Sequence, residues 1–569
     1  MDINVRVAGA AGQGVETTGA LLVESFAKLG LYVFASQSYM SRIRGGLNWF
    51  DVRIGDRQLF SGREQADVLV ALSAEALEFL GKSAAPGGMT LFDGEGRDGV
   101  VGIKFEEVAK ELTGAKIMAN TVAAGAVFAV LGYEVEALTG QLEERFRRKG
   151  PEVVESNAKC ARRGAELAGA HGGVVKGPRG AGAPGQVYAG NEAVGLAAAA
   201  AGVKLVTSYP MTPSTGVFTF LAKAADEYGI VVEQAEDEIA AINMVCGATY
   251  AGVPAMTTTS GGGFALMVEG VALAGMLELP AFILLAQRPG PATGLPTRTG
   301  QQDLKFAINA GHGEFAKAVF APGTPGQAYE VTRRALETAH KYQTPVIMLT
   351  DQYLADMQMN SDEHGSEPLD RTARPIDRCI LERPPADYVR YAVTPSGVSP
   401  RALPGSGAFV ALDSDEHAED GHITEDLEAR VRLQDKRMAK YRGMTEEALA
   451  PERYGPAEAE HVLVCWGSTY GPCREAVDLL NEAGGSAAMV HFAQVWPVNA
   501  EAARAAIALA RRITVVEGNS TGQLASVLRE RGVLGEAELM LRYDGMPFTG
   551  EEIMRRISAP RSSVPRARS

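Results

Sequence analysis

Cysteine is scarce in this sequence, and its spacing does not suit an iron–sulfur cluster. No two of the cysteines form a Cys-x-x-Cys pair; the five are Cys160, Cys246, Cys379, Cys465 and Cys473. A cluster takes about four thiolates, usually with short spacing between them. We therefore expect that this chain holds no cluster and that its thiols are free and buried.

A long apolar run and a basic leader are also missing. No run of about 18 apolar residues occurs, so we expect no transmembrane helix. Residues 1–14, MDINVRVAGAAGQG, enter a strand pattern without the basic and then apolar segments of a signal peptide. We expect a cytoplasmic protein.

Positive charge is in deficit. The chain has 55 Lys and Arg against 69 Asp and Glu, a net charge of −14 and a pI near 5.3. Nucleic acids and anionic membranes are therefore disfavoured as partners, because both are negatively charged. Small anionic ligands stay open, since they need only a local cationic pocket.

The rest of the composition is that of a globular protein of several domains. Apolar residues make up 46% and charged residues 22% of 569 residues. In residues 1–168, helical patterns separate apolar strand candidates at 4–10, 31–36, 48–55, 66–72, 89–93 and 100–105. This alternation predicts an α/β domain with a mostly parallel, doubly wound sheet. Residues 169–189, rich in Gly and Ala, are expected to be a linker.

Two further stretches follow the same α/β pattern, so we predict three α/β domains. Residues 190–355 begin with a helix at 191–202 and carry strand candidates at 202–206, 230–234, 254–260, 281–287 and 345–351. Residues 458–545 carry others at 461–468, 487–494 and 512–518. We expect 356–457 to be an extended connection and 546–569 a C-terminal tail, with a disordered basic end at 560–569.

A Gly-rich turn, GAAGQG (9–14), lies between the first strand and a helix pattern. Its small residues, Gly12 and Gly14 among them, would let the backbone approach a phosphate at the helix N-terminus. The turn departs from G-x-G-x-x-G, and no acidic residue ends a second strand about twenty residues later. Tight packing or contact with some other phosphate fits better than NAD.

A cationic loop, SRIRGGLNW (41–49), precedes the third strand candidate. Arg42 and Arg44 stand before a glycine pair. The loop is either a solvated turn or a segment that meets a phosphate or a partner chain, and the residues leave both readings open.

Two prolines bracket one threonine in TSYPMTPST (207–215). The preceding strand would place Thr212 at the carboxyl edge of a parallel sheet, where open α/β folds bind ligands. Pro210 and Pro213 restrict the backbone, so the Thr212 hydroxyl would be held in a pre-set direction. Ser214 and Thr215 could equally cap the next helix, and we expect Ser214 to be the cap and Thr212 to be functional.

Glu238 opens the apolar segment that follows the next strand, in EQAEDEIAAINM (233–244). Glu236 and Asp237 suit a helix N-terminus. Glu238 begins the buried part, and a buried carboxylate needs a partner. No basic residue lies nearby in sequence, so a ligand could be that partner.

Arg288 stands at the end of an all-apolar strand, in LLAQRPGPATGLPTRTGQQDL (284–304). Prolines and glycines then stiffen a loop that carries Thr293 and Arg298. An arginine can grip a carboxylate with two parallel hydrogen bonds. Arg288 and Thr212 share one sheet edge in this prediction, so both could reach one small acidic substrate.

These motifs together resemble the α subunits of 2-oxoacid:ferredoxin oxidoreductases, with a γ-like domain fused in front at 1–168. The resemblance covers nearly the whole chain and rests on YPMTPST, EDEIAAINM, SGGGFALMVEG (260–270), GPATGLPTRTGQ, NAGHGEF (309–315), YQTPVIMLTD (342–351) and VEGNSTGQLASVLR (516–529). It implies a pyrimidine-binding domain at 190–355 and a transketolase-like C-terminal domain at 458–545.

The resemblance also implies a reaction and its cofactors. A 2-oxoacid and coenzyme A give an acyl-CoA, CO₂ and electrons for ferredoxin, and thiamine diphosphate performs the carbon chemistry. The diphosphate, Mg²⁺ and a [4Fe–4S] cluster would belong to a β chain, with the active site at the interface and an (αβ)₂ assembly. No metal ligand is expected on this chain.

Residue roles follow from the same resemblance. Glu238 would bind the aminopyrimidine ring, beside Pro210 and Met211, where Met replaces the usual Ile. Thr212 and Arg288 would bind the keto acid. Three more sets of residues have implied roles: Thr293 and Arg298 in substrate binding, Gly12, Gly14 and Arg44 in coenzyme A binding, and residues 413–423, otherwise a solvated turn, near the active site.

The preferred substrate is expected to be 2-oxoglutarate, although pyruvate and branched-chain 2-oxoacids stay open. Two readings of other classes are a dinucleotide-binding dehydrogenase acting alone and a non-catalytic scaffold. The first needs an intact fingerprint, which is missing. The second would be favoured by loss of Glu238, Thr212 or Arg288, and all three are present.

Overall fold

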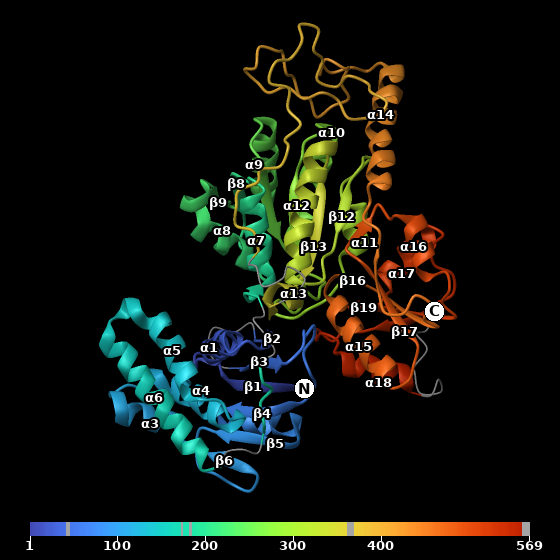
Figure 1. Cartoon of the computed structure of the whole chain (residues 1–569). Coiled ribbons are helices and arrows are strands. Elements are labelled where there is room, and N and C mark those ends of the chain that lie inside the picture. The colour runs from blue at the N-terminus through green and yellow to red at the C-terminus, as the bar shows by residue number, and fades with distance from the viewer. Residues whose placement is uncertain (41–45, 172–174, 181–184, 361–368, 560–569) are drawn as a thin grey trace. The chain divides into compact units, whose positions relative to one another are not determined.

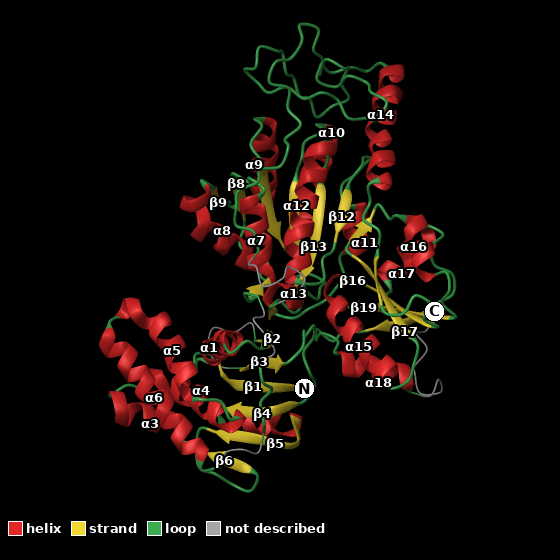
Figure 2. Ribbon diagram, viewed as in Figure 1, coloured by secondary structure: helices red, strands yellow, loops and turns green. Residues whose placement is uncertain are grey.

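The computed structural model describes residues 1–40, 46–171, 175–180, 185–360 and 369–559. The chain forms two compact units. Unit 1 comprises Met1–Tyr188, Asp356–Pro368 and Thr549–Ser569, and unit 2 comprises Ala189–Ala355 and Leu369–Phe548. The predicted α/β class is confirmed, since three sheets are flanked by helices (Figures 1 and 2).

The sheet of unit 1 is mixed. Its strand order is β6-β5-β4-β1-β3-β2-β14-β7, and its strands are β1 (Asp2–Ala10), β2 (Tyr32–Ser38), β3 (Leu47–Gly55), β4 (Ala66–Ala71), β5 (Ala84–Phe92), β6 (Val100–Gly102), β7 (Tyr188–Ala189) and β14 (Gln358–Met359). The prediction of a mostly parallel sheet fits β1, β4, β5 and β6, but β3 runs antiparallel to β1 and β2. The connection between β2 and β3 is too short for a crossover helix, which explains the reversal.

Helices of unit 1 pack closely where glycines allow it. They are α1 (Val15–Lys28), α2 (Ala74–Leu80), α3 (Phe105–Thr113), α4 (Ala119–Leu131), α5 (Val135–Phe146), α6 (Pro151–Gly169) and α18 (Gly550–Ser558). A Cβ on Gly125 of α4 would lie 2.0 Å from the carbonyl of Ala161 in α6, so this crossing requires glycine. Helix α18 belongs to this unit, with Arg63 Nε 3.0 Å from Glu551 Oε1.

The larger sheet of unit 2 has seven strands in the order β18-β12-β13-β11-β10-β8-β9, all parallel except β18. They are β8 (Leu205–Ser208), β9 (Val231–Gln234), β10 (Ala255–Thr259), β11 (Phe282–Gln287), β12 (Ala318–Phe320), β13 (Val346–Asp351) and β18 (Gln494–Trp496). The helices around them are α7 (Gly190–Ala200), α8 (Thr215–Tyr228), α9 (Glu238–Tyr250), α10 (Gly261–Met276), α11 (Leu304–Asn309), α12 (Pro325–Tyr342) and α13 (Gln352–Asp356).

The smaller sheet of unit 2 has the order β15-β17-β16-β19-β20. Its strands are β15 (Glu452–Tyr454), β16 (His461–Trp466), β17 (Ala487–Phe492), β19 (Arg512–Glu517) and β20 (Glu538–Leu541), with α15 (Tyr470–Glu482), α16 (Ala500–Ile507) and α17 (Gln523–Glu530). Because β18 pairs with β12 of the larger sheet, one apolar core runs through both sheets.

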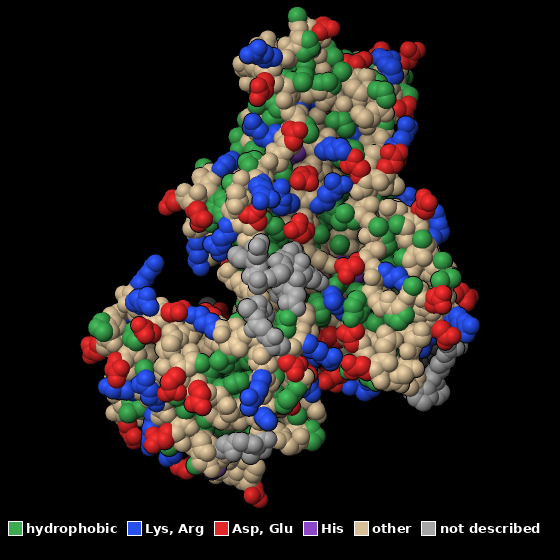
Figure 3. All heavy atoms as spheres, in the orientation of Figure 1, with side chains coloured by type: hydrophobic (Ala, Val, Ile, Leu, Met, Phe, Trp, Pro, Cys, Tyr) green, Lys and Arg blue, Asp and Glu red, His purple; other side chains and the backbone are tan. Residues whose placement is uncertain are grey.

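Residues 369–426 have little regular structure, but the twenty-residue helix α14 (Leu427–Glu446) follows them. Figure 1 shows these loops gathered at the N-terminal end of α14. On the face drawn in Figure 3, acidic and basic side chains are interspersed over both units. None of the helices within the described ranges is long and apolar enough to span a membrane.

Candidate functional site

Thr212 and Arg288 meet at the carboxyl edge of the larger sheet of unit 2. Thr212 follows β8, Arg288 follows β11, and Arg288 Nη1 donates a hydrogen bond to the Thr212 carbonyl at 2.7 Å. The predicted neighbourhood is therefore present, although the guanidinium bonds the backbone of Thr212 and not its hydroxyl. Arg288 Nε is buried and has no hydrogen-bond partner in the described part of the chain. Part of the guanidinium of this half-buried cation is thus left for an anionic ligand.

Asp303 affects the pKa of Arg288. It is not among the site residues predicted from the sequence. Burial lowers the pKa of Arg288, and the charge of Asp303 opposes that shift. Burial raises the pKa of Asp303 to about 6, with Arg288 opposing. A Cβ on Gly261 would lie 2.8 Å from Asp303 Oδ2, so the carboxylate lies against the first turn of α10. The signal available in the sequence was an acidic residue, Asp303, at the end of the loop that follows Arg288.

The Pro-rich turn itself is held by Ser214. The Ser214 amide and hydroxyl both donate to the Met211 carbonyl, at 2.9 and 2.7 Å. The expected cap is therefore wrong in its detail: Ser214 occupies the N-cap position of α8, but its side chain makes no capping bond. The hydroxyl instead closes the turn that carries Pro210, Met211 and Thr212.

Glu238 is the first residue of α9, and it is 3% exposed. Its Oε1 has no hydrogen-bond partner among the described residues. A Cβ on Gly263 would lie 2.4 Å from that oxygen, so only glycine lets the carboxylate lie against α10. A buried carboxylate oxygen without a donor suits a ligand that supplies an N–H. This fits the nitrogen-rich pyrimidine ring of thiamine.

The loop after Arg288 is fixed by the smaller sheet. Gln301 Nε2 donates to the Trp466 carbonyl at 2.8 Å, and the Gly518 amide donates to Gln301 Oε1 at 2.8 Å. Asn519 Nδ2 donates to the Gln301 carbonyl at 3.0 Å. Residues 299–301 (TGQ) and 517–519 (EGN) therefore connect the two sheets of unit 2 and fix the position of the loop.

Two other predicted residues lie on this loop. Thr293 is exposed, and Arg298 is partly buried. Arg298 Nη1 lies 3.6 Å from Met546 Sδ, and burial lowers the pKa of its guanidinium. Arg298 thus packs on the segment that precedes α18, and a role for either residue in substrate binding stays a prediction.

The Gly-rich turn of unit 1 is explained by packing. Gly12 and Gly14 have positive φ of 91° and 76°, and a Cβ on Gly14 would collide with the Asn120 side chain. Gln13 Oε1 accepts from the Ala10 amide at 2.7 Å and closes the turn. Coenzyme A binding by these glycines stays a prediction, and Arg42 and Arg44 lie outside the described residues.

The acidic segment 413–423 is anchored and is not a free surface turn. Glu416 forms two ion pairs with α14, one with Arg430 Nη1 at 2.6 Å and one with Arg437 Nη2 at 2.9 Å. His417 is buried, with its ring 4.0 Å from that of Tyr391.

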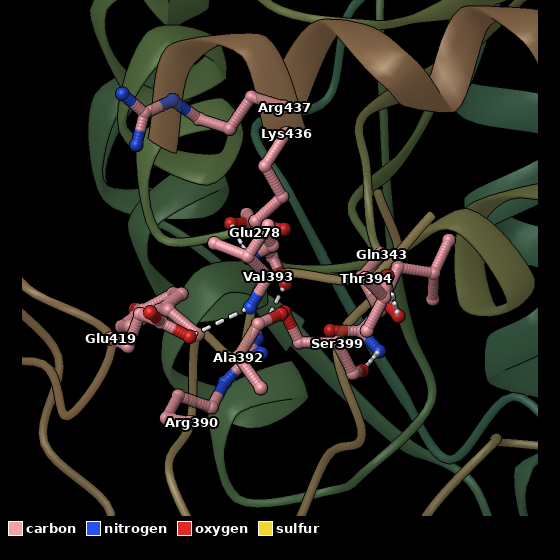
Figure 4. Close-up of polar contacts among 12 residues, drawn as sticks. Glu278, Gln343, Arg390, Ala392, Val393, Thr394, Ser399, Glu419, Lys436 and Arg437 are labelled. Atoms are coloured by element: carbon pink, nitrogen blue, oxygen red, sulfur yellow. Dashed lines mark hydrogen bonds and ion pairs between the residues drawn. The ribbon is translucent and has the colours of Figure 1, made fainter. Parts of the chain in front are cut away.

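A second buried carboxylate, Glu278, lies just beyond the C-terminus of α10 (Figure 4). Lys436 and Lys440 of α14 each lie 2.7 Å from one of its oxygens. Arg390 Nη2 donates to its carbonyl at 2.8 Å. The lysines, with burial opposing, lower the pKa of Glu278 to about 2. Both oxygens of this carboxylate have a cation of the chain at 2.7 Å, although only Oε1 also accepts a hydrogen bond of good geometry.

Metal-ligating groups are not gathered at the candidate site. Across the ranges that the structure describes, no three His, Cys, Asp or Glu side chains are placed to hold a metal ion.

Two family models match the chain. The model described as "Pyruvate flavodoxin/ferredoxin oxidoreductase, thiamine diP-bdg" matches residues 196–436, which include Thr212, Glu238 and Arg288. The model described as "Pyruvate ferredoxin/flavodoxin oxidoreductase" matches residues 4–167.

Relatives match over nearly the full length. The chain is 31% identical to 2-oxoacid:ferredoxin oxidoreductase 2, subunit alpha, of Aeropyrum pernix, over 97% of each protein. It is 29% identical to the 2-oxoglutarate oxidoreductase subunit KorA of Mycobacterium tuberculosis, over 98% of this chain and 91% of the relative. Among solved structures, 2-oxoglutarate:ferredoxin oxidoreductase from Magnetococcus marinus, with 2-oxoglutarate, coenzyme A and succinyl-CoA bound, matches with a TM-score of 0.90 and 31% identity, over 98% of this chain and 99% of that one.

Proposed function

Because the chain belongs to the family of 2-oxoacid:ferredoxin oxidoreductase α subunits, we propose that it acts on 2-oxoglutarate. The reaction converts 2-oxoglutarate, coenzyme A and two oxidised ferredoxins to succinyl-CoA, CO₂, a proton and two reduced ferredoxins, and it is reversible. The names of the Mycobacterium tuberculosis relative and the Magnetococcus marinus structure support this substrate among the 2-oxoacids.

The structural observation that supports thiamine-dependent chemistry is the unpartnered oxygen of Glu238. Thiamine diphosphate, when bound, supplies the nucleophilic carbon and the electron sink for decarboxylation. Glu238 would accept a hydrogen bond from the pyrimidine ring and so favour the ring tautomer that takes a proton. Its burial excludes water from that bond and strengthens it.

Substrate binding is assigned to the neighbouring turn. Arg288 would hold the keto-acid carboxylate through the part of its guanidinium that has no internal partner. Its bond to the Thr212 carbonyl fixes the turn, so that the Thr212 hydroxyl is positioned beside the same substrate. The second carboxylate of 2-oxoglutarate needs another cation, from Arg298 or from a partner chain.

A β subunit completes the site in this proposal, with Mg²⁺ and a [4Fe–4S] cluster on that subunit. Helices α9 and α10 support a partner at this edge. They are apolar on nearly all sides, yet Ile239, Met244 and Leu266 are 48, 41 and 51% exposed. A helix that is apolar all round is normally buried. We assign this face to the β subunit, next to Glu238.

The test uses the chain co-purified with its β partner in the absence of oxygen. Coenzyme A-dependent reduction of a viologen dye or of ferredoxin is followed with 2-oxoglutarate, pyruvate and 2-oxoisovalerate. We expect a preference for 2-oxoglutarate. Arg288→Ala should lower kcat/KM by roughly 100-fold or more, because a charge-assisted pair to the substrate is worth about 2–5 kcal/mol. Arg162→Ala, an exposed arginine of unit 1, is the matched control.

Each outcome has one meaning. Activity on pyruvate alone would keep the family and overturn the substrate. Full activity in Arg288→Ala would remove this arginine from the site. A complex that holds thiamine diphosphate and the cluster but turns over no 2-oxoacid would favour the scaffold reading.

A further inference from the structure

A cavity of about 650 Å³ lies within unit 2, away from the motifs assigned above. It is lined by residues of α11, α14 and α17, by the segment around β18, and by the end of the NAGHGEF motif. The proposed function gives this motif no role. A volume of this size is typical of small-molecule sites.

Lys317 is the unusual residue of this cavity. It is 6% exposed. Glu314 and Glu530 line the same cavity, but Glu530 pairs with Lys305, and no ion pair joins Lys317 to a carboxylate among the described residues. Its Nζ has one long hydrogen bond, 3.3 Å to the Ile308 carbonyl, and it lies 4.2 Å from the centre of the Phe315 ring. A buried ammonium with so few partners calls for a counter-charge.

The other buried lysines of unit 2 show what such a counter-charge looks like. Lys436 and Lys440 are each 2% exposed, and both pair with Glu278. Figure 4 shows Lys436 beside Glu278. Lys317 differs from them because it lines a cavity and has no ion pair among the described residues. The missing anion can therefore come from outside the chain.

The rest of the lining indicates what kind of anion fits. The lining is mixed: it includes the rings of Phe315, Tyr441 and Trp496 and also the charged residues Lys305, Glu314, Glu530 and Arg531. The Trp496 indole donates to the Tyr441 hydroxyl at 3.2 Å, and the Arg531 guanidinium lies 4.1 Å from the Trp496 ring. These contacts hold both rings in place. Two other cations line the cavity, but Lys305 pairs with Glu530 at 3.5 Å and Arg531 lies on the Trp496 ring. The amine of Lys317, beside aromatic rings, suits a carboxylate with an apolar body.

We propose that this cavity is a binding site for a small organic carboxylate, with Lys317 pairing the carboxylate and the Phe315, Tyr441 and Trp496 rings contacting its apolar body. The site is separate from the Glu238 and Arg288 site and does not depend on the proposed function. A ligand there would contact α11, α14 and α17 at once, and so would join the two sheets of unit 2.

Competitive acetylation of the intact complex tests the proposal. Burial lowers the pKa of the Lys317 amine to about 8, so acetic anhydride can report on it. The acetylation rate of Lys317 is measured by mass spectrometry relative to that of the exposed Lys223. The probes are benzoate, its neutral analogue benzyl alcohol, and inorganic phosphate. We expect benzoate alone to slow acetylation of Lys317 several-fold and to leave Lys223 unchanged.

Three results would overturn the proposal. Unchanged acetylation with benzoate would show that no carboxylate binds. Equal protection by phosphate would indicate a general anion site, and equal protection by benzyl alcohol would indicate an apolar cavity in which Lys317 plays no part. As a second measurement, benzoate should raise the melting temperature of the wild type and of Lys223→Met, but not of Lys317→Met. Acetylation of the wild type decides the matter even if Lys317→Met does not fold.

Discussion

Unit 2 buries two glutamates near opposite ends of α10, and only one of them has its partners inside the chain. Each has one oxygen without a hydrogen bond, but both oxygens of the fully buried Glu278 form ion pairs, with Lys436 and Lys440, whereas Glu238, 3% exposed, has no ion pair among the described residues. Burial alone therefore does not distinguish a structural carboxylate from a functional one. The difference lies in the partners. Lysines of the same chain pair with Glu278 and stabilise the fold, whereas Glu238 has no such cation and can bind a ligand.

The largest effect expected from this comparison is on turnover. Glu238→Gln should reduce kcat about 10²- to 10⁴-fold, the usual range for a group that assists proton transfer. Its melting temperature should stay close to that of the wild type, because no internal bond to Oε1 is lost. Dye reduction and thermal unfolding of the complex measure the two effects.

The neighbouring, exposed Glu236→Gln is the matched control for that experiment. It should leave both quantities unchanged. A Glu238→Gln complex that turns over normally would remove this residue from the site. A large loss of stability would show that Glu238 is a structural residue like Glu278.

The reverse pattern is expected at Glu278. Glu278→Gln leaves two buried lysines without their anion, which should lower the free energy of unfolding by about 3–5 kcal/mol. Urea unfolding of the complex measures this loss, and the exposed Glu330→Gln should show none. Adding Lys436→Met and Lys440→Met to Glu278→Gln should restore most of the stability, because the unpaired charges are then removed. Failure of that rescue would argue against charge as the cause.

The same cluster should make unit 2 sensitive to acid. The pKa of Glu278 is lowered from 4.5 to about 2. The stability it contributes is therefore present above pH 4.5 and is lost as the pH falls toward about 2. A shift of this size corresponds to roughly 3 kcal/mol. The urea midpoint should fall less steeply between about pH 5 and about pH 3 in Glu278→Gln than in the wild type. Parallel pH profiles would contradict the assignment.

The buried apolar strands of this architecture could be predicted from the sequence. Strands such as β1, β11, β13 and β16 are long buried runs, and their periodicity is visible without a structure. The short strands β12, β15, β18 and β20 were missed. Their place depends on pairing with distant strands.

Helix α14 was hidden for a different reason. Its buried face includes Lys436, Arg437 and Lys440, so hydrophobic periodicity could not reveal it. Those charges are buried because Glu278 and Glu416 pair with them, and these carboxylates lie far away in sequence. The pattern of residues in a short stretch of sequence cannot show ion pairs with carboxylates so far away in the chain.

The candidate site was predicted to a similar extent. The strand ends placed Thr212 and Arg288 at one edge, as the structure has them. Asp303 was missed, because its effect arises only when the loop folds back on Arg288. The geometric reason for the glycine run at 261–263 could not be read from the sequence either, since it depends on what each missing Cβ would meet.

That glycine run gives the smallest and most local test of the comparison. A Cβ on Gly263 would lie 2.4 Å from Glu238 Oε1, whereas a Cβ on Gly262 would meet nothing closer than 4.0 Å. Gly263→Ala should therefore displace the carboxylate, lower activity and cost about 1–3 kcal/mol of stability. Gly262→Ala, one residue away on an exposed face of the same helix, should retain activity and gain up to about 1 kcal/mol. Dye reduction and thermal unfolding of the two variants in the same complex make the measurement. Equal behaviour of the pair would mean that the Glu238 carboxylate can move without consequence, and its position would then no longer support a role in binding the cofactor ring.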